Sequence, residues 1–195
     1  MTQDALDNRW ITCRNAAGEE IPGHSVAVVT GVEFRDGTAV LVLAQHSSSL
    51  LQGLVVTGYG PIADGEYGVC TFDPLVVVAC DANDGPAALG QFWGPKSDQW
   101  TLAKNYAGFY VLGEIEPGLA YCRRFEGALL GKADSAVDAG QQGIISLQSG
   151  ETLGAESDTA DDIDTVHLRL GNAAANAWVY LLPVNGRFEV INTEC

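Results

Sequence analysis

The sequence lacks any long apolar run. The stretch from Leu75 to Cys80 is among the longest, and it has only the length of one strand. A helix that crosses a bilayer needs roughly 20 apolar residues. The N-terminal segment "MTQDALDNRW" is polar and acidic, without the charged and then apolar pattern of a cleaved signal. The sequence therefore predicts neither a membrane-spanning segment nor a secretory leader.

Basic residues are also scarce. The chain has 10 Lys and Arg against 25 Asp and Glu, which gives a net charge of −15. Partners that present phosphate groups are bound through Lys and Arg, so the composition disfavours nucleic acid and an anionic membrane surface. A strong acidic excess gives solubility and mutual repulsion of free subunits. Such a charge is compatible with a protein stored at high concentration before it assembles.

Patterns that carry chemistry are missing as well. No cysteine pair has CxxC spacing, the three histidines stand far apart, and there is neither a G-x-S-x-G elbow nor a phosphate-binding glycine loop. We therefore expect no catalytic residue, no metal ligand and no cofactor. The cysteines are expected to be small buried apolar groups in a protein made in a reducing compartment. They are Cys13, Cys70, Cys80, Cys122 and Cys195.

Two acidic clusters raise the question of calcium. They are "DANDG" at 81–85 and "ESDTADDID" at 156–164. Calcium prefers several hard oxygen ligands on a flexible loop, but neither cluster has EF-hand spacing. Solvated acidic loops are the favoured interpretation, and the second cluster is the alternative place for calcium.

What the sequence does contain is strands and turns. Apolar residues make up 47% of the chain, and 23 glycines punctuate it. The segment 31–45 predicts a hairpin whose two-residue turn is Asp36-Gly37. The segment 107–127 predicts two strands around Glu116-Pro117-Gly118. The C-terminal segment predicts a third hairpin with Asn185-Gly186 at its turn, and Asp73-Pro74 predicts a break between strands.

These signals predict an all-β fold. We expect two small β-sandwich or barrel-like domains with short turns and at most one short helix. The only stretch that resembles a short helix or a linker is 127–143, so the domains are expected at 1–125 and 126–195. No internal repeat is visible between the two halves.

The segment "GQFWGPKSDQW", residues 90–100, concentrates aromatic side chains around a turn. Aromatic rings on a rigid turn suit stacking on sugar rings or on a partner's apolar pocket. In a small β domain they more often close the open end of the core. Core or subunit interface is the favoured interpretation and a ligand platform is the alternative. The candidate contact residues are Phe92, Trp93, Trp100 and Tyr106.

This segment also carries a resemblance. The runs "VVTGYGPIADGEYGVCTF" and "GQFWGPKSDQWTLAKNYAGFYVLGE" resemble virion structural proteins of tailed bacteriophages and prophages. The likeness extends to "GEEIPGHSVAVVTGVE" upstream and to "LLGKADSAVDAGQQGIISLQSGE" and "AWVYLLPVNGRFEVINTEC" downstream. The block around Trp93 and Trp100 is its most specific part. Where similar chains have a basic and aromatic segment before the last hairpin, this chain has the alanine-containing "HLRLGNAAANAWV".

The resemblance implies a structural protein of the virion, made in the host cytoplasm, and not an enzyme. A head-decorating or cement role is favoured, followed by a collar or tail-fibre role. The implied partners are other virion proteins of the capsid or tail and further copies of the chain. The N-terminal domain would dock on the particle, and the C-terminal domain would project or meet a neighbouring subunit. A carbohydrate-binding or host-adhesion module is the alternative, with Trp93 and Trp100 against a host-surface glycan.

Overall fold

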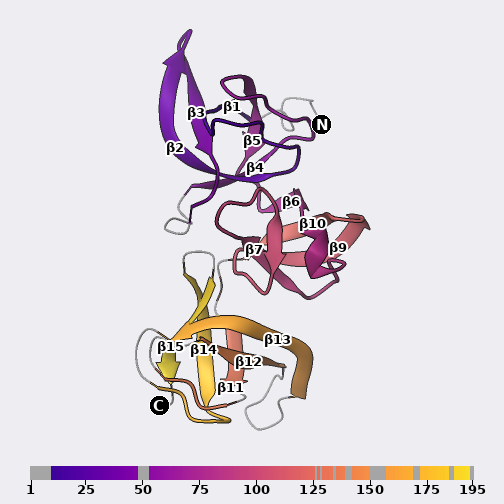
Figure 1. Cartoon of the computed structure of the whole chain (residues 1–195), viewed down its shortest axis with the longest axis vertical. Coiled ribbons are helices and arrows are strands. Elements are labelled where there is room, and N and C mark those ends of the chain that lie inside the picture. Colours follow the sequence, from indigo (N-terminus) through magenta and orange to yellow (C-terminus); the bar gives the residue numbers. More distant parts are fainter. Residues whose placement is uncertain are drawn as a thin grey trace, which may run out of the picture.

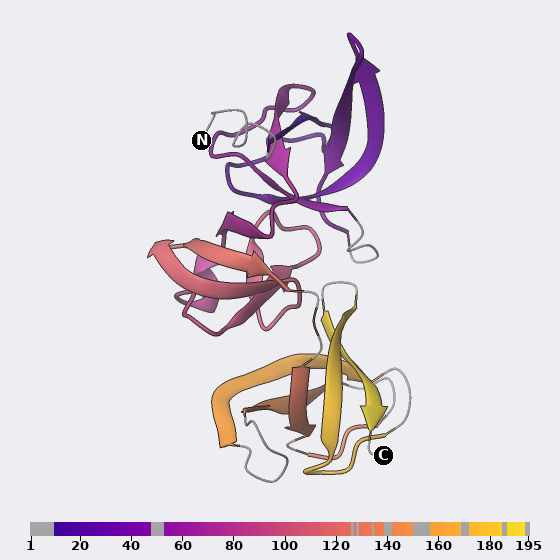
Figure 2. The same cartoon turned by 180° about the vertical axis from the view of Figure 1, so that it is seen from behind.

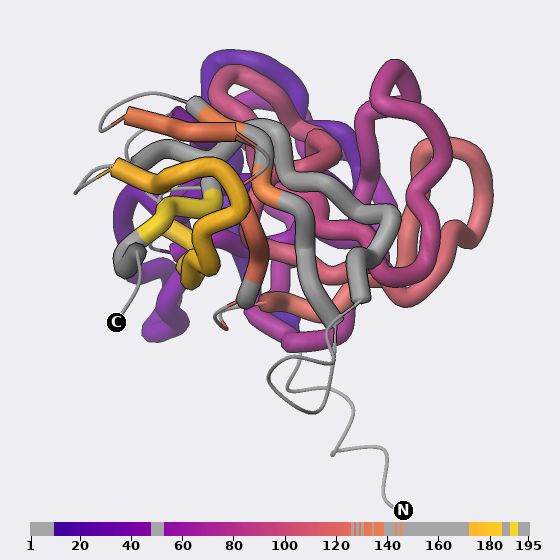
Figure 3. The backbone as a smooth tube through the Cα atoms, turned by 90° about the horizontal axis from the view of Figure 1, so that it is seen from below, coloured from indigo at the N-terminus to yellow at the C-terminus, as the bar shows by residue number. Residues whose placement is uncertain are grey.

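The computed structural model is built almost entirely of β-strands, which confirms the all-β prediction (Figure 1). It describes residues 10–47, 53–125, 127, 129–133, 135–138, 142–149, 157–168, 172–184 and 187–193. Among these residues the one helical segment is a 3₁₀ turn, η3 (Ala82–Asp84). The strands form three five-stranded units that follow one another along the longest axis of the molecule. Figure 2 shows the same arrangement from behind, and in Figure 3 the units overlap when viewed along that axis.

The first barrel is closed and contains the first five strands. They are β1 (Ile11–Asn15), β2 (Val26–Arg35), β3 (Thr38–Ala44), β4 (Leu54–Thr57) and β5 (Tyr67–Thr71). Its order is β1-β3-β2-β4-β5, and β5 pairs again with β1. The β1–β3 pair is parallel, and the other pairs are antiparallel.

The middle sheet follows directly. Its strands are β6 (Leu75–Ala79), β7 (Phe92–Pro95), β8 (Leu102–Lys104), β9 (Phe109–Glu116) and β10 (Leu119–Arg124). Its order is β6-β10-β9-β7-β8 with antiparallel neighbours. A parallel bridge between Cys80 and Leu102 joins the two edges. The middle sheet thus has the strand order of the first barrel, with its first and third strands in parallel contact.

The third barrel is closed and contains the last five strands. They are β11 (Leu129–Ala133), β12 (Gln142–Ser149), β13 (Ser157–Leu168), β14 (Trp178–Val184) and β15 (Arg187–Thr193). Its order is β11-β12-β13-β15-β14, and only the β13–β15 pair is parallel. If the strands are counted from β13 to β15 and then on to β11 and β12, their order around the barrel is the same as in the first barrel. The third barrel is therefore a circular permutation of the first.

Two loops in each closed barrel support this correspondence. An isolated antiparallel bridge joins Ile21 to Ile62 in the first barrel and Val137 to Ala173 in the third. In the first barrel Gly68 lies six residues after Ile62, and a Cβ there would come within 2.5 Å of the Ile62 side chain. In the third barrel a residue six positions after Val137 meets the same restriction. It is Gly143, where a Cβ would lie 2.3 Å from the Val137 side chain.

The predicted hairpins explain how the strands are connected. Asp36 and Gly37 have φ of 50° and 80°, as a type I′ turn requires, and Arg35 pairs with Thr38 across it. Gly118 has φ of 78° in the turn between β9 and β10. The break at Asp73-Pro74 is confirmed, because β5 ends at Thr71 and β6 begins at Leu75. Strands β14 and β15 flank Asn185-Gly186, which lies outside the described residues.

The stretch 127–143, interpreted from the sequence as a short helix or a linker, contains strand β11 instead. Leu129–Ala133 forms this strand, which pairs with the next strand, β12, and with β14 far along the chain. Pairing within the barrel therefore determines the conformation of this segment. The division expected at 125–126 falls between β10 and β11, and the segment before it holds two five-stranded sheets that share a core.

That shared core depends on β4 and on the start of β2, Val26–Val28, which are buried on both faces. Ala27 and Val55 point into the first barrel. Their neighbours Val26, Val28 and Val56 point the other way and pack against the middle sheet. Strands covered on both faces read as continuous apolar runs, which is what "VAVV" and "LVV" are.

We predict that the Gly68→Ala substitution destabilises the protein by about 1–3 kcal/mol, since the new methyl group would overlap the end of Ile62. Urea unfolding followed by circular dichroism measures this change. Gly60→Ala is the control, because nothing lies within 4 Å of a Cβ at Gly60. The double variant Ile62→Val/Gly68→Ala should lose less stability than the sum of its single changes. Equal stability of the Gly68→Ala variant and the wild type would contradict the packing described above.

Candidate functional site

The aromatic segment 90–100 lies mostly inside the molecule. Trp93 is 0% exposed and belongs to the core that the middle sheet shares with the first barrel. Its indole Nε1 donates a hydrogen bond to Oε1 of Gln91, at 3.1 Å. Trp93 therefore has no surface with which to contact a ligand.

Phe92, the neighbour of Trp93 on β7, points to the opposite side. It is buried in the core of the third barrel. Its ring makes edge-to-face contacts with three other rings, at centroid distances of 5.5 Å to Tyr110, 4.9 Å to Phe125 and 5.4 Å to Phe188. Because alternate side chains of a strand face opposite ways, β7 contributes to both junctions of the middle sheet.

The other two candidate residues are half-buried. Trp100 packs against the core of the first barrel, and its Nε1 donates to Oε1 of Glu19 at 2.9 Å. Tyr106 lies in the turn before β9. The four predicted residues thus occupy different places: two are buried in separate cores and two lie at the surface. The glycan-binding alternative places Trp93 and Trp100 against a glycan, and the burial of Trp93 prevents that contact.

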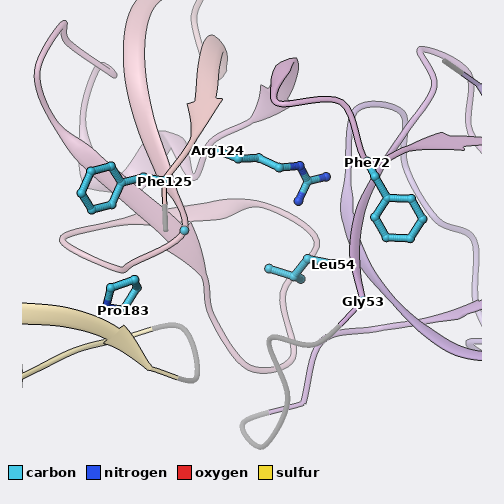
Figure 4. Close-up of a pocket in the computed structure, with 7 residues that line it drawn as sticks. Gly53, Leu54, Phe72, Arg124, Phe125 and Pro183 are labelled. Atoms are coloured by element: carbon cyan, nitrogen blue, oxygen red, sulfur yellow. The ribbon is translucent and has the colours of Figure 1, made fainter. Parts of the chain in front are cut away.

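A cavity of about 430 Å³ lies where the three units meet (Figure 4). Figure 4 shows Arg124 extending from the middle sheet into the space between Phe125 and Pro183 on one side and Leu54 and Phe72 on the other. The lining residues come from all three units: Gly53, Leu54, Phe72, Gly108, Arg124, Phe125 and Pro183.

Arg124 fastens the first barrel to the middle sheet at this cavity. Its Nε donates to the carbonyl oxygen of Asp73 at 3.0 Å, and its Nη2 donates to that of Thr71 at 3.2 Å. The guanidinium carbon lies 5.3 Å from the centre of the Phe109 ring. These contacts hold the segment between β5 and β6 against the end of β10. Sequence reasoning did not identify this role, because the partners are backbone carbonyls far away in the chain.

His46 is the most unusual polar side chain of the interior. It is buried, and neither ring nitrogen has a hydrogen-bond partner among the described residues. Burial lowers the pKa of this imidazole, since a buried cation loses its hydration. His46 therefore stays neutral below the pH at which an exposed histidine ionises. His24 lies at the surface of the first barrel, and the side chain of His167 on β13 lies outside the described set.

The four described cysteines are free and buried, as predicted. Burial raises the pKa of Cys80 and of Cys122 to about 12. The pKa of Cys70 is also raised, by the hydrogen bond that it shares with Cys13 and by burial. These thiols are therefore neutral packing groups at physiological pH. Cys195 lies outside the described residues.

The aspartates of the first acidic cluster accept hydrogen bonds from nearby backbone N–H groups. Asp81 Oδ1 accepts hydrogen bonds from the backbone N and the Nδ2 of Asn83, at 3.0 and 2.9 Å, which caps η3. Asp84 Oδ2 accepts from the backbone N of Lys104 at 2.9 Å. In the second cluster Glu156 and the side chains of β13 lie outside the described residues. In the part of the chain that is described, no group of three His, Cys, Asp or Glu is placed to hold a metal ion.

We predict that replacing Phe92 by alanine costs about 3–5 kcal/mol of folding free energy, because the change removes the ring at the centre of the aromatic contacts. The matched control is Phe72→Ala, since Phe72 is an exposed ring. Thermal unfolding of the two variants measures the difference. If both substitutions cost the same, the packing of the third barrel on Phe92 is refuted.

We also predict a loss of stability at alkaline pH. Unfolded cysteines ionise near pH 9, whereas folded Cys80 and Cys122 stay protonated to about pH 12. The unfolded state therefore releases protons first, and the free energy of unfolding falls as pH rises from about 9 to about 12. Urea titrations across this range measure the slope. The Cys80→Ala/Cys122→Ala variant should show a shallower slope, and an unchanged slope would contradict the assignment.

Comparison with protein-family models, with curated proteins and with solved structures finds no match for the chain. Among the described residues, no helix is long and apolar enough to cross a membrane. The resemblance to virion proteins stays a prediction that rests on the quoted segments. A functional conclusion therefore has to be argued from the surfaces of the molecule.

Proposed function

We propose that the protein is a non-enzymatic structural component of a tailed-phage virion, in the role of a capsid-attached decoration or cement protein. Collar and tail fibre are the other positions that the proposal covers. The observation that most supports this proposal is the exposed apolar surface at the end of the β2–β3 hairpin. Phe34 is 80% exposed there and Val32 is 55% exposed. Large apolar groups left in water at a projecting tip are suited to contact a partner.

The strand pairing explains why this hairpin projects. Strand β4 pairs with β2 only at Val26–Val28, and β1 pairs with β3 only at Leu41–Leu43. The N–H of Val29 also donates to the carbonyl oxygen of Gly53, and beyond it the described residues show β2 and β3 in backbone pairing only with each other. One face of this ribbon is held by contacts of Glu33 with Arg14 and of Arg35 with the Tyr67 ring. The end of a two-stranded ribbon gains stability when another chain covers it. Figures 1 and 2 both show it at the end of the molecule distant from the third barrel.

The third barrel contains the corresponding hairpin in a docked state. Pro183 and Phe188 are directly opposite each other on β14 and β15, as Phe34 and Ala39 are on β2 and β3. Both pairs lie at the same distance from their two-residue turns. Phe188 contacts Phe92 of the middle sheet, and Pro183 lines the cavity between the units. The fold thus uses this hairpin face for docking, and in the first barrel the same face is free to receive an external partner.

The remaining properties fit an assembly component. Buried side chains join the three units, so a partner that binds the end of the first barrel holds the whole molecule. The net charge of −15 keeps free subunits apart until a specific surface captures them. We propose other virion proteins and further copies of the chain as partners, and the virion as its location after synthesis in the host cytoplasm. Repeated weak contacts give such proteins their affinity.

We predict that the Val32→Thr/Phe34→Ser variant is depleted in virions. A phage from which the gene has been deleted is complemented with wild-type or variant protein, and the protein in purified particles is quantified by immunoblot. Removing two exposed apolar side chains should reduce incorporation by about tenfold or more, because central apolar contacts dominate interfaces. Soluble expression and unfolding temperature should stay unchanged, since neither side chain is buried.

The control for this experiment is Leu89→Ser, which removes a similarly exposed apolar side chain from the turn before β7. It should be incorporated like the wild type. Absence of the wild-type protein from purified particles would refute the virion proposal. Normal incorporation of the hairpin variant would refute the hairpin as the contact.

A further inference from the structure

The imidazole of His46 is buried without compensation. His46 lies two residues after the end of β3 and is 2% exposed, and neither ring nitrogen has a hydrogen-bond partner among the described residues. A buried polar atom without a partner costs folding free energy, and such atoms are rare in native proteins. An apolar side chain would fill this place at a lower cost. Packing alone therefore does not explain a histidine at this position.

The backbone of His46 holds a segment of the middle unit. Residues 96–100 connect β7 to β8 and contact the first barrel. The N–H of Asp98 donates to the carbonyl oxygen of His46 at 3.0 Å, and the N–H of Val26 donates to that of Trp100 at 2.9 Å. The side chain of Trp100 packs against the core of the first barrel. The 96–100 segment is thus docked on the first barrel, and His46 lies at the contact.

We infer that protonation of the His46 ring releases the 96–100 segment from the first barrel, which makes this contact sensitive to acid. A charged imidazole is unstable in a buried place where neither nitrogen is bonded, because nothing replaces its lost hydration. Release of the 96–100 segment would admit water to the ring and remove this cost. The inference goes beyond the virion proposal and does not rest on it.

The groups that act on the ring all favour this direction. Burial has the largest effect and lowers the pKa of His46, while the carbonyl of Lys96 and the carboxylate of Asp98 favour the protonated ring without outweighing burial. In the part of the chain that the structure describes, no other charged group has a resolved effect on this imidazole. The side chains of Lys96 and Asp98 are exposed, so release of the segment buries no charge.

The 96–100 segment can move without disrupting the middle sheet. Strands β7 and β8 pair as far as Pro95 and Leu102, and the segment lies outside this pairing. None of its residues is fully buried. Asp98 has φ of 60°, in the left-handed region that residues other than glycine rarely adopt. Segments with few buried contacts open at a lower free energy than the core does.

The sign of the pH dependence follows from the two states. In the docked state burial holds the pKa of His46 below its usual value, whereas in the open state the hydrated ring titrates near pH 6.5. Above about pH 6.5 the ring is neutral in both states, and the docked state keeps its full stability. Below that pH only the open state takes up a proton. The equilibrium constant for opening then rises by up to about tenfold per pH unit, until the docked ring also ionises.

Amide hydrogen exchange of the full chain, followed by NMR between about pH 7.5 and about pH 5, tests the inference. After correction for the intrinsic pH dependence of exchange, the amides of Val26 and Asp98 should lose protection by about tenfold over this range. The amide of Ala133, which donates to Ala177 in the third barrel, should stay protected. The ring protons of His46 should titrate below about pH 6.5.

His46→Leu removes the titrating group and both unpaired nitrogens. In this variant the protection of the Val26 and Asp98 amides should no longer depend on pH. His46→Asn is a second variant without a titrating side chain and should behave in the same way. The matched control is His24→Asn, which removes a histidine from the surface of the first barrel and should keep the pH dependence. Asparagine tolerates the φ of 57° at this position.

The inference is overturned if both amides keep their protection down to about pH 5, or if the His46 ring titrates at or above about pH 6.5. It is also overturned if the pH dependence survives in His46→Leu and His46→Asn. Loss of protection at Ala133 together with the two reporter amides would overturn it as well, since acid would then unfold the whole chain. None of these outcomes depends on whether the protein is found in virions.

Discussion

The two-sided burial of β4 and of the start of β2 is the constraint on which the rest of the molecule depends. One face of these strands closes the first barrel, and the other face is covered by the middle sheet. Neither unit can complete its core alone, because Val26, Val28 and Val56 would be left in water. This requirement fixes the contact between the two units.

The middle sheet contacts the third barrel in a similar way through one strand, β7, which is also buried on both faces. Trp93 and Phe92 are adjacent on β7 and enter different cores. The pair of aromatic side chains thus holds both neighbours of the middle sheet, and Arg124 adds hydrogen bonds at the cavity where all three units meet. Glycine at position 94 follows from the same crowding, since a Cβ there would lie 2.0 Å from the carbonyl oxygen of Ala107. The concentration of aromatic residues in 90–100 therefore reflects two junctions.

Local signals were enough to predict the turns and the all-β class. Asp36-Gly37 and Asp73-Pro74 restrict their own backbones, so their effect can be read from neighbouring residues alone. Strand β11 was missed because it is completed by pairing with β14, which is far along the chain, as well as with its neighbour β12. The correspondence between the first and third barrels was missed for a different reason. Only a few residues are equivalent in the two barrels, such as Ile62 and Val137, or Gly68 and Gly143. The permuted strand order also prevents a linear alignment of the two sequences. The four candidate residues are dispersed over the molecule because closeness in sequence does not place Trp93 and Trp100 in one core.

The correspondence between the first and third barrels indicates which kind of partner surface the β2–β3 hairpin would contact. In the third barrel Phe188, which lies opposite Pro183 on the hairpin, contacts the ring of Phe92 edge to face. A hairpin end of the same geometry, bearing Phe34, needs a receiving surface of the same kind: an apolar, aromatic-lined depression and not a charged patch. The acidic surface of another copy of this chain would not supply it, whereas an apolar depression on a capsid or tail protein would.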